Sequence, residues 1–171
     1  MRVVRTTTIH RRPQDVFTWI EDPRLATRWQ PEVAEYEITE QRPEVLGTEF
    51  REVLRGRGGR GGSVELRGRV TAYTPDHRMD FDLDGPRPHV HTSFTLTPVP
   101  EGTELRVELD LTVSAWLAPA VRGRVSRRLE AELRLLRTLC EQDGEDQRAN
   151  PHQPDSFRTG PPTSSRKQVR G

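Results

Sequence analysis

Three charged residues occupy positions where the surrounding pattern predicts apolar side chains. Glu52 lies between Phe50 and Leu54, on the face of a predicted strand that should point inward. A buried carboxylate is costly unless it is paired or protonated, and carboxylates in such positions often have a function. Burial would raise the pKa of Glu52 and suit it to general acid/base catalysis. The alternative is a wet concave face, or a bulge near Gly56 that shifts the register.

Arg128 and Glu132 are the other two charged residues in unusual positions. They stand one helical turn apart, inside the apolar arc of a predicted C-terminal helix rather than opposite it. In a cavity, Arg128 would hold a ligand carbonyl or stabilise a developing enolate, and Glu132 would exchange protons. Glu52, Arg128 and Glu132 are therefore the catalytic candidates. The alternative for Arg128 is a guanidinium that reaches water at the edge of the helix.

Aromatic side chains at inward positions would supply the wall of a cavity. They bury large areas, and a tyrosine hydroxyl also orients a ligand. The predicted ligand-binding residues are Trp29, Tyr36, Phe50, Phe81, Phe94 and Trp116. The alternative is that these side chains, together with the many leucines, fill the interior and close the cavity.

The elements that must position these residues follow from the period of the hydrophobic pattern. Strands are predicted at residues 3–10, 34–39, 50–54, 64–72, 79–83, 90–96 and 105–111. Their period of two, with charges on the other face, is typical of antiparallel strands with one face covered. Two short helices are predicted between the first two strands, at residues 14–20 and 24–30.

One long helix is predicted near the C-terminus, from about Leu117 to Cys140 or Gln142, with Asp143-Gly144 ending it. It is the only element long enough to cover the apolar face of the sheet. Its apolar arc comprises Leu117, Val121, Val125, Leu129, Leu133, Leu135, Leu136, Leu139 and Cys140.

This order of elements resembles the helix-grip fold of the Bet v 1-like, START-related (SRPBCC) superfamily, and in particular its bacterial polyketide cyclase/dehydrase-like branch. The resemblance covers residues 1–142 and rests on residues 8–23, 46–51 and 101–105 and on the long last helix. It implies an α+β fold, with a curved antiparallel sheet of about seven strands wrapped around the C-terminal helix. The superfamily holds cyclases, dehydratases, lipid carriers, hormone receptors and chaperone activators, so the fold alone does not settle function.

Composition indicates how the chain is divided and which classes of partner it binds. Residues 143–171 contain only Ala149, Phe157 and Val169 as apolar side chains, which predicts a disordered tail after a helix-grip domain at residues 1–142. The 27 basic and 26 acidic residues nearly cancel, so we expect no nucleic-acid partner and no steering towards an anionic membrane. The absence of a leader-like segment and of long apolar runs predicts a cytoplasmic protein without membrane insertion. We expect either a monomer or a homodimer.

Two further motifs have structural explanations. His89 and His91 have a spacing that two metal ligands can use, but their parity places them on the outer face without a convincing acidic neighbour, so no metal is predicted. Residues 55–62, RGRGGRGG, are similar to an RNA-binding segment. Because glycine also suits a mobile hairpin loop, we predict a loop that gates the cavity.

The leading prediction is a protein that binds a small hydrophobic or aromatic molecule, lipid or polyketide-like, in an internal cavity without a cofactor. Cyclase or dehydratase chemistry on that molecule would extend this function. The alternative is a protein-interaction module, similar to toxin-like or chaperone-activating relatives, without catalysis. A continuous cavity of several hundred Å³ favours the first prediction. A filled core with an apolar surface patch favours the second.

Overall fold

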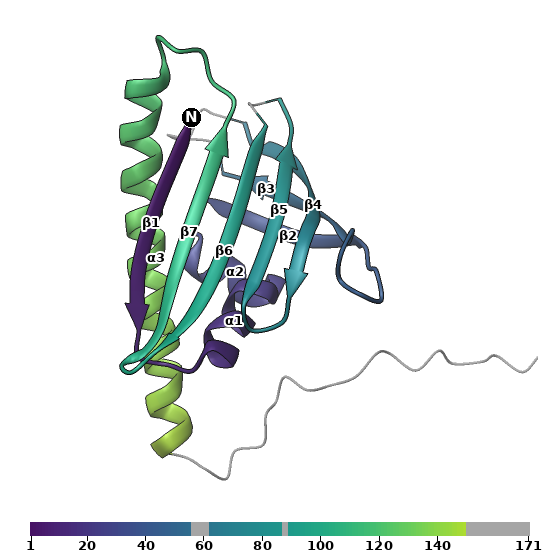
Figure 1. Cartoon of the computed structure of the whole chain (residues 1–171). Coiled ribbons are helices and arrows are strands. Elements are labelled where there is room, and N and C mark those ends of the chain that lie inside the picture. Colours follow the sequence, from purple (N-terminus) through teal and green to yellow (C-terminus); the bar gives the residue numbers. More distant parts are fainter. Residues whose placement is uncertain (56–61, 87–88, 150–171) are drawn as a thin grey trace, which may run out of the picture.

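The computed structural model describes residues 1–55, 62–86 and 89–149, and side chains up to Glu145. The elements in chain order are β1 (Arg2–Ile9), α1 (Pro13–Glu21), α2 (Pro23–Trp29), β2 (Val33–Glu40), β3 (Glu49–Leu54), β4 (Val64–Thr74), β5 (Arg78–Asp84), β6 (Val90–Val99), β7 (Gly102–Leu111) and α3 (Ala118–Ala149). The predicted α+β architecture, with two short helices after the first strand and a long C-terminal helix, is confirmed (Figure 1). Most of the predicted gating loop and of the predicted disordered tail lies outside the described residues.

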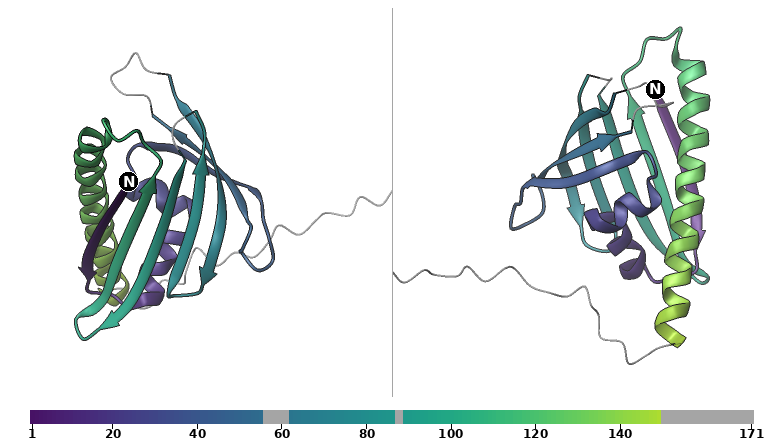
Figure 2. Two further views of the ribbon diagram at one scale, coloured as in Figure 1. Left: turned by 45° about the horizontal axis from the view of Figure 1, so that its top comes forward. Right: turned by 180° about the vertical axis from the view of Figure 1, so that it is seen from behind.

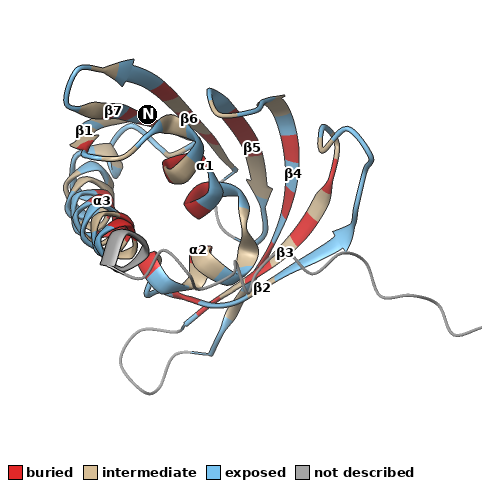
Figure 3. Cartoon of the chain, turned by 90° about the horizontal axis from the view of Figure 1, so that it is seen from below, coloured by how far each residue is buried: buried red, intermediate tan, exposed pale blue. Residues whose placement is uncertain are grey.

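The seven strands form one antiparallel sheet in the order β1-β7-β6-β5-β4-β3-β2. The first strand of the chain therefore pairs with the last, with Arg2 opposite Asp110 and Ile9 opposite Thr103. The sheet curves, and α3 runs alongside β1 while α1 and α2 lie on the concave side (Figure 2). Seen from below, buried residues occur both on the strands and on the helices that lie around the concave side of the sheet (Figure 3).

The two short helices are held together at their junction. Asp22 ends α1 and caps α2, since its carboxylate accepts a hydrogen bond from the backbone N–H of Arg24 at 2.9 Å. The indole N–H of Trp29, at the end of α2, donates to the carbonyl of Trp19 in α1 at 3.0 Å. Because both tryptophans are buried, this bond fixes the angle between the helices inside the concave face.

The helix α3 is longer than predicted. It continues through Asp143 and Gly144 to Ala149, so the predicted end at these two residues is wrong. Gly144 is buried, and a Cβ at this position would overlap the Arg11 guanidinium. The glycine therefore allows close packing against the segment after β1 rather than ending the helix.

Burial along α3 is uneven. Leu129, Leu133, Leu136 and Cys140 are buried against the interior. No residue from 118 to 128 is buried, and Leu117 just before the helix is exposed. The predicted apolar arc is thus covered only in its later part. None of the helices in the described part of the chain is long and apolar enough to cross a membrane.

Candidate functional site

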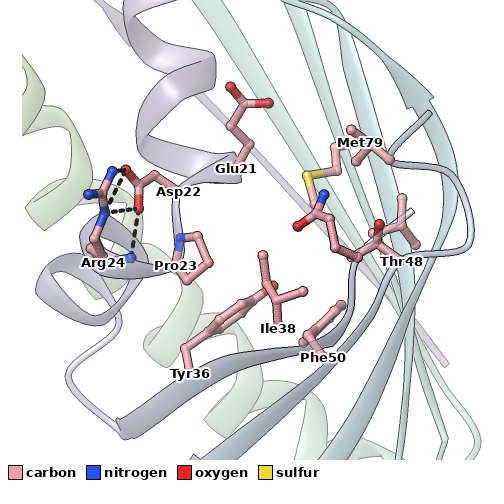
Figure 4. Close-up of a pocket in the computed structure, with 12 residues that line it drawn as sticks. Glu21, Asp22, Pro23, Arg24, Tyr36, Ile38, Thr48, Phe50 and Met79 are labelled. Atoms are coloured by element: carbon pink, nitrogen blue, oxygen red, sulfur yellow. Dashed lines mark hydrogen bonds and ion pairs between the residues drawn. The ribbon is translucent and has the colours of Figure 1, made fainter. Parts of the chain in front are cut away.

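A pocket of about 530 Å³ opens between the junction of α1 and α2 and the inner faces of β2 to β5 (Figure 4). Its lining comes from two helices, four strands and the loop between β2 and β3. The lining residues are Glu21, Asp22, Pro23, Arg24, Tyr36, Ile38, Gln41, Val45, Thr48, Phe50, Val70 and Met79. Apolar side chains form the walls, and the charged residues come from the ends of the two short helices.

The loop between β2 and β3 forms one wall of the pocket and is held by hydrogen bonds. The backbone N–H of Gly47 donates to the carbonyl of Val70 at 2.9 Å, and the backbone N–H of Arg42 donates to Thr48 Oγ1 at 3.0 Å. Val45 has a φ of 64°, which is rare for a β-branched residue. Such strain persists only where the surroundings impose it and is often found at binding sites.

Two carboxyl groups and one guanidinium lie at the rim of the pocket. Tyr73 donates a hydrogen bond from its hydroxyl to Glu21 Oε2 at 2.8 Å. Burial raises the pKa of Glu21, and the bond from Tyr73 opposes this shift only in part. Asp22 binds Arg24 through an Nη2–Oδ2 contact of 2.6 Å. The rim therefore carries more acidic than basic groups.

Of the six predicted ligand-binding aromatics, Tyr36 and Phe50 line this pocket. Their rings stack with centroids 4.9 Å apart. The remaining inward aromatics continue as a chain of ring contacts, from Phe50 to Phe81 at 5.4 Å, from Phe81 to Phe94 at 5.9 Å and from Phe94 to Trp29 at 6.3 Å. Phe81, Phe94 and Trp29 are buried and lie outside the lining of this pocket, so their role as ligand-binding residues stays a prediction.

Trp116 is the clearest departure from the predicted site. It is 80% exposed in the turn before α3 and lies outside the lining of the pocket. The prediction placed it on the cavity wall together with the other large aromatic side chains. The turn instead carries the side chain away from the interior.

The three catalytic candidates lie together, as a partly buried cluster between α3 and the β2–β3 pair. Arg128 Nε donates to Glu132 Oε1 at 2.8 Å, and its Nη1 lies 2.9 Å from Glu32 Oε2, just before β2. Glu52 is 5% exposed and interacts electrostatically with both Arg128 and Glu132. The cluster thus combines three carboxyl groups with one guanidinium. Sequence reasoning found all of its members except Glu32, which stands in a turn and shows no pattern.

The shortage of positive charge shapes the titration of the cluster. Burial raises the pKa of Glu52 to about 7, Arg128 opposes this shift, and Glu132 adds to it. Burial also raises the pKa of Glu132, again against Arg128. Burial lowers the pKa of Arg128, but the surrounding carboxylates outweigh that effect and raise it overall. Near neutral pH, Glu52 is the group that can take up or release a proton.

Tyr36 connects the pocket to the cluster. It lies opposite Glu52 in the β2–β3 register, and its ring projects into the pocket (Figure 4). Burial, and then the Glu52 carboxyl, raise the pKa of the Tyr36 hydroxyl, so it stays protonated. Within the described chain, neither this hydroxyl nor the Glu52 carboxyl makes a hydrogen bond. Glu52 itself does not line the pocket.

Several lining residues were not predicted. Val70 and Met79 were visible as inward positions of alternating strands, but parity does not say which inward positions border a cavity. Glu21 and Thr48 carried no signal, because one ends a short helix and the other stands in a loop. Their role depends on packing between elements far apart in the chain.

His91 on β6 and His89 just before it are both partly exposed, but they do have acidic neighbours. His89 Nδ1 is 2.8 Å from Asp84 Oδ1, and His91 Nδ1 is 2.7 Å from Asp82 Oδ1. The antiparallel β5–β6 register places the second pair opposite one another. The described residues contain no group of three or more side chains that could hold a metal ion.

The family of the protein follows from a comparison that spans the whole sheet and most of α3. A family model described as polyketide cyclase/dehydrase and lipid transport matches residues 1–141. The chain belongs to this family. The predicted relation to the polyketide cyclase/dehydrase branch is therefore confirmed, and its members are grouped with proteins of lipid transport.

Solved structures agree with the polyketide cyclase/dehydrase fold. A START superfamily protein from Mycobacterium smegmatis is 20% identical with a TM-score of 0.71, over 82% of this chain and 97% of that one. A protein of unknown function from Staphylococcus aureus is 12% identical with a TM-score of 0.70, over 85% and 96% of the two chains. At these identities the likeness establishes the fold alone. No match was found among curated proteins.

Proposed function

We propose that the protein binds a small, mainly apolar molecule in the pocket between the α1–α2 junction and β2 to β5. The observation that carries this proposal is the pocket itself, with a volume of about 530 Å³ and apolar walls that include Tyr36, Ile38 and Phe50. This size and composition are typical of small-molecule sites. Removing the apolar surface of the ligand from water supplies most of the affinity.

The polar groups of the pocket narrow the class of ligand. The Tyr36 hydroxyl is a hydrogen-bond donor that no described residue occupies, so it suits a carbonyl or hydroxyl oxygen on the ligand. The rim carries the carboxyl groups of Glu21 and Asp22 against the single guanidinium of Arg24, which disfavours an anionic head group. A neutral lipid or polyketide-like molecule with one oxygen function fits these requirements.

A second candidate function is proton transfer on the bound molecule, as in a cyclase or dehydratase. Glu52 favours it, because its carboxyl makes no hydrogen bond within the described chain and its pKa is about 7, near the optimum for a general acid or base. Arg128 would stabilise negative charge on the reacting oxygen, and Glu132 would hold the guanidinium in place. The reacting end of the ligand would have to pass the Tyr36–Phe50 pair to reach Glu52.

Binding is tested with the neutral fluorescent probe N-phenyl-1-naphthylamine, which is small enough for the pocket. We expect saturable binding to one site. Ile38→Glu should weaken binding at least about tenfold, because a charge at the rim opposes entry of an apolar molecule. Leu46→Glu is the matched control, since Leu46 is exposed in the adjacent loop but does not line the pocket. If both variants weaken binding equally, or if neither variant weakens it, the probe binds elsewhere.

The catalytic candidate is tested with the natural ligand, extracted under denaturing conditions from protein purified from its own host and identified by mass spectrometry. Glu52→Gln should bind this compound with nearly unchanged affinity but lose its turnover by about a hundredfold or more. If the unaltered protein binds the compound but does not turn it over, the protein is a carrier and the catalytic function is excluded.

A further inference from the structure

The segment that joins β7 to α3 exposes a continuous apolar stretch. Residues 113–121 read VSAWLAPAV, contain no charged side chain, and include no buried residue. Trp116 is 80% exposed and Leu117 is 39% exposed. The turn projects at the end of the sheet away from α1 and α2 (Figure 1), so it is separate from the pocket. A single exposed apolar residue is ordinary, but a projecting uncharged stretch with a tryptophan at its centre is not.

The charge next to this stretch has one sign. Arg122, Arg124 and Arg127 follow it on the first turns of α3, are exposed, and form no ion pair with any residue that the structure describes. No acidic residue occurs between Asp110 and Glu130. The near-neutral charge of the whole chain therefore conceals a local positive region.

Two acidic residues near this end of the sheet lie on strands rather than in the stretch itself. Asp110 is exposed near the end of β7, and Asp84 at the end of β5 is hydrogen-bonded to His89. The hydrogen bond with Asp84 raises the pKa of His89, and burial opposes this shift only in part. Asp84 is thus partly neutralised by its own histidine, and Asp110 is the acidic group nearest to the stretch in sequence.

We propose that this segment docks on the surface of an anionic lipid bilayer, with Trp116 and Leu117 at the level of the headgroups and Arg122 and Arg124 against their negative charges. Tryptophan prefers the membrane–water interface because its ring is apolar and its N–H is polar. Arginines within a Debye length of an anionic surface each strengthen binding. The contact is peripheral, and no helix crosses the bilayer.

Two features favour a bilayer over a protein partner. Hot spots between proteins are aromatic or arginine side chains seated in a desolvated pocket within a polar rim, whereas Trp116 is 80% exposed on a projecting turn. A run of about twenty residues with basic but no acidic side chains also complements a uniformly anionic surface better than the mixed charges of most protein surfaces.

The full chain is tested by co-sedimentation with vesicles of phosphatidylcholine, with and without phosphatidylglycerol, at about 0.1 M salt. Binding is expected only to the anionic vesicles and should weaken as salt is added. Tryptophan fluorescence gives a local readout, since Trp19 and Trp29 are only 3% and 2% exposed. The emission of Trp116 should shift to the blue on binding, and brominated lipid should quench it.

Variants assign the contact to this segment. Arg122→Gln with Arg124→Gln should weaken binding by roughly 25-fold, at about fivefold for each arginine, and Trp116→Ala should abolish the blue shift. Arg134→Gln is the matched control and should bind like the unaltered chain. Arg134 is also exposed on α3 but lies about 15 Å further along the helix, beyond the Debye length.

Three results would overturn the proposal. The first is no co-sedimentation with anionic vesicles even at low salt. The second is vesicle binding that is equal in the arginine variants, Trp116→Ala and the control. The third is self-association of the free protein in sedimentation velocity that Trp116→Ala removes, which would assign the stretch to an interface between two copies of the chain.

Discussion

The ring of Tyr36 stacks on the ring of Phe50, with centroids 4.9 Å apart and planes 11° from parallel. This pair forms the inner end of the pocket, because Glu52 is the next inward residue of β3 and no longer lines it. The pair therefore stands between the apolar pocket and the charged cluster around Arg128.

Replacing Glu52 by glutamine should change how stability depends on pH. The native-state pKa of about 7 lies above the ordinary value of 4.5, so the native state binds the proton more tightly than the unfolded state does. This contribution is fully present below about pH 4.5, is lost as the pH rises through 7, and amounts to roughly 3 kcal/mol. Glu52→Gln has no such loss, so its stability relative to the unaltered protein should increase from pH 4.5 to pH 8.

Urea unfolding at the two pH values measures this difference. Glu101→Gln, at an exposed turn, serves as the control and should show no comparable change between them. A Glu52→Gln difference that is the same at both pH values would mean that Glu52 titrates in the native state as it does in water.

Removing the guanidinium of the cluster should destabilise the fold strongly. Arg128→Met leaves Glu132 and Glu52 buried without a positive partner, which should lower the free energy of unfolding by about 3–5 kcal/mol at pH 8. The exposed neighbour variant Arg127→Met should cost less than about 0.5 kcal/mol. Adding Glu132→Gln to Arg128→Met should restore part of the loss, and a double variant less stable than Arg128→Met would contradict the electrostatic explanation.

Two glycine substitutions should act in opposite directions. A Cβ at Gly68, on β4, would overlap the ring of Phe50, so Gly68→Ala should cost about 1–3 kcal/mol and disturb the Tyr36 stack. A Cβ at Gly123, within α3, meets no other atom nearby, so Gly123→Ala should stabilise the protein by about 0.5–1 kcal/mol. Thermal unfolding measures both effects. A Gly68→Ala variant that melts no lower than the unaltered protein would show that the Phe50 ring moves aside without cost.

The single cysteine should be inert in the native protein. Cys140 is fully buried, and burial raises the pKa of its thiol to about 12, so very little thiolate is present at pH 8. Ellman's reagent should therefore label it only after the protein is denatured. Rapid stoichiometric labelling of the folded protein would show that the later part of α3 separates easily from the sheet.

Much of the fold was predictable because one face of each strand meets water and the other is covered. That contrast produces the period of two, and the same parity placed Glu52 on the buried face. The end of α3 was not predictable, because the sequence does not show whether a glycine ends a helix or makes room for a neighbour. Gly144 makes room for Arg11.

The site was predictable only in part, because parity gives a face and not a neighbourhood. Tyr36 and Phe81 both point inward, but one borders the pocket while the other is packed between two further rings. The partner of His91 was missed for a similar reason, since the Asp82 contact depends on the register of two strands. Contacts set by register or by packing between distant elements leave no local trace in the sequence.

The pairing of β1 with β7 has a consequence for the order in which the protein is made. Roughly ninety residues separate Ile9 from its partner Thr103, so a ribosome adding about 5–20 residues per second completes the first strand some 5–20 s before its partner emerges. α3, which lies along the same strand, comes later still. The N-terminal strand therefore stays without the sheet edge and the helix that will cover it until both have been synthesised.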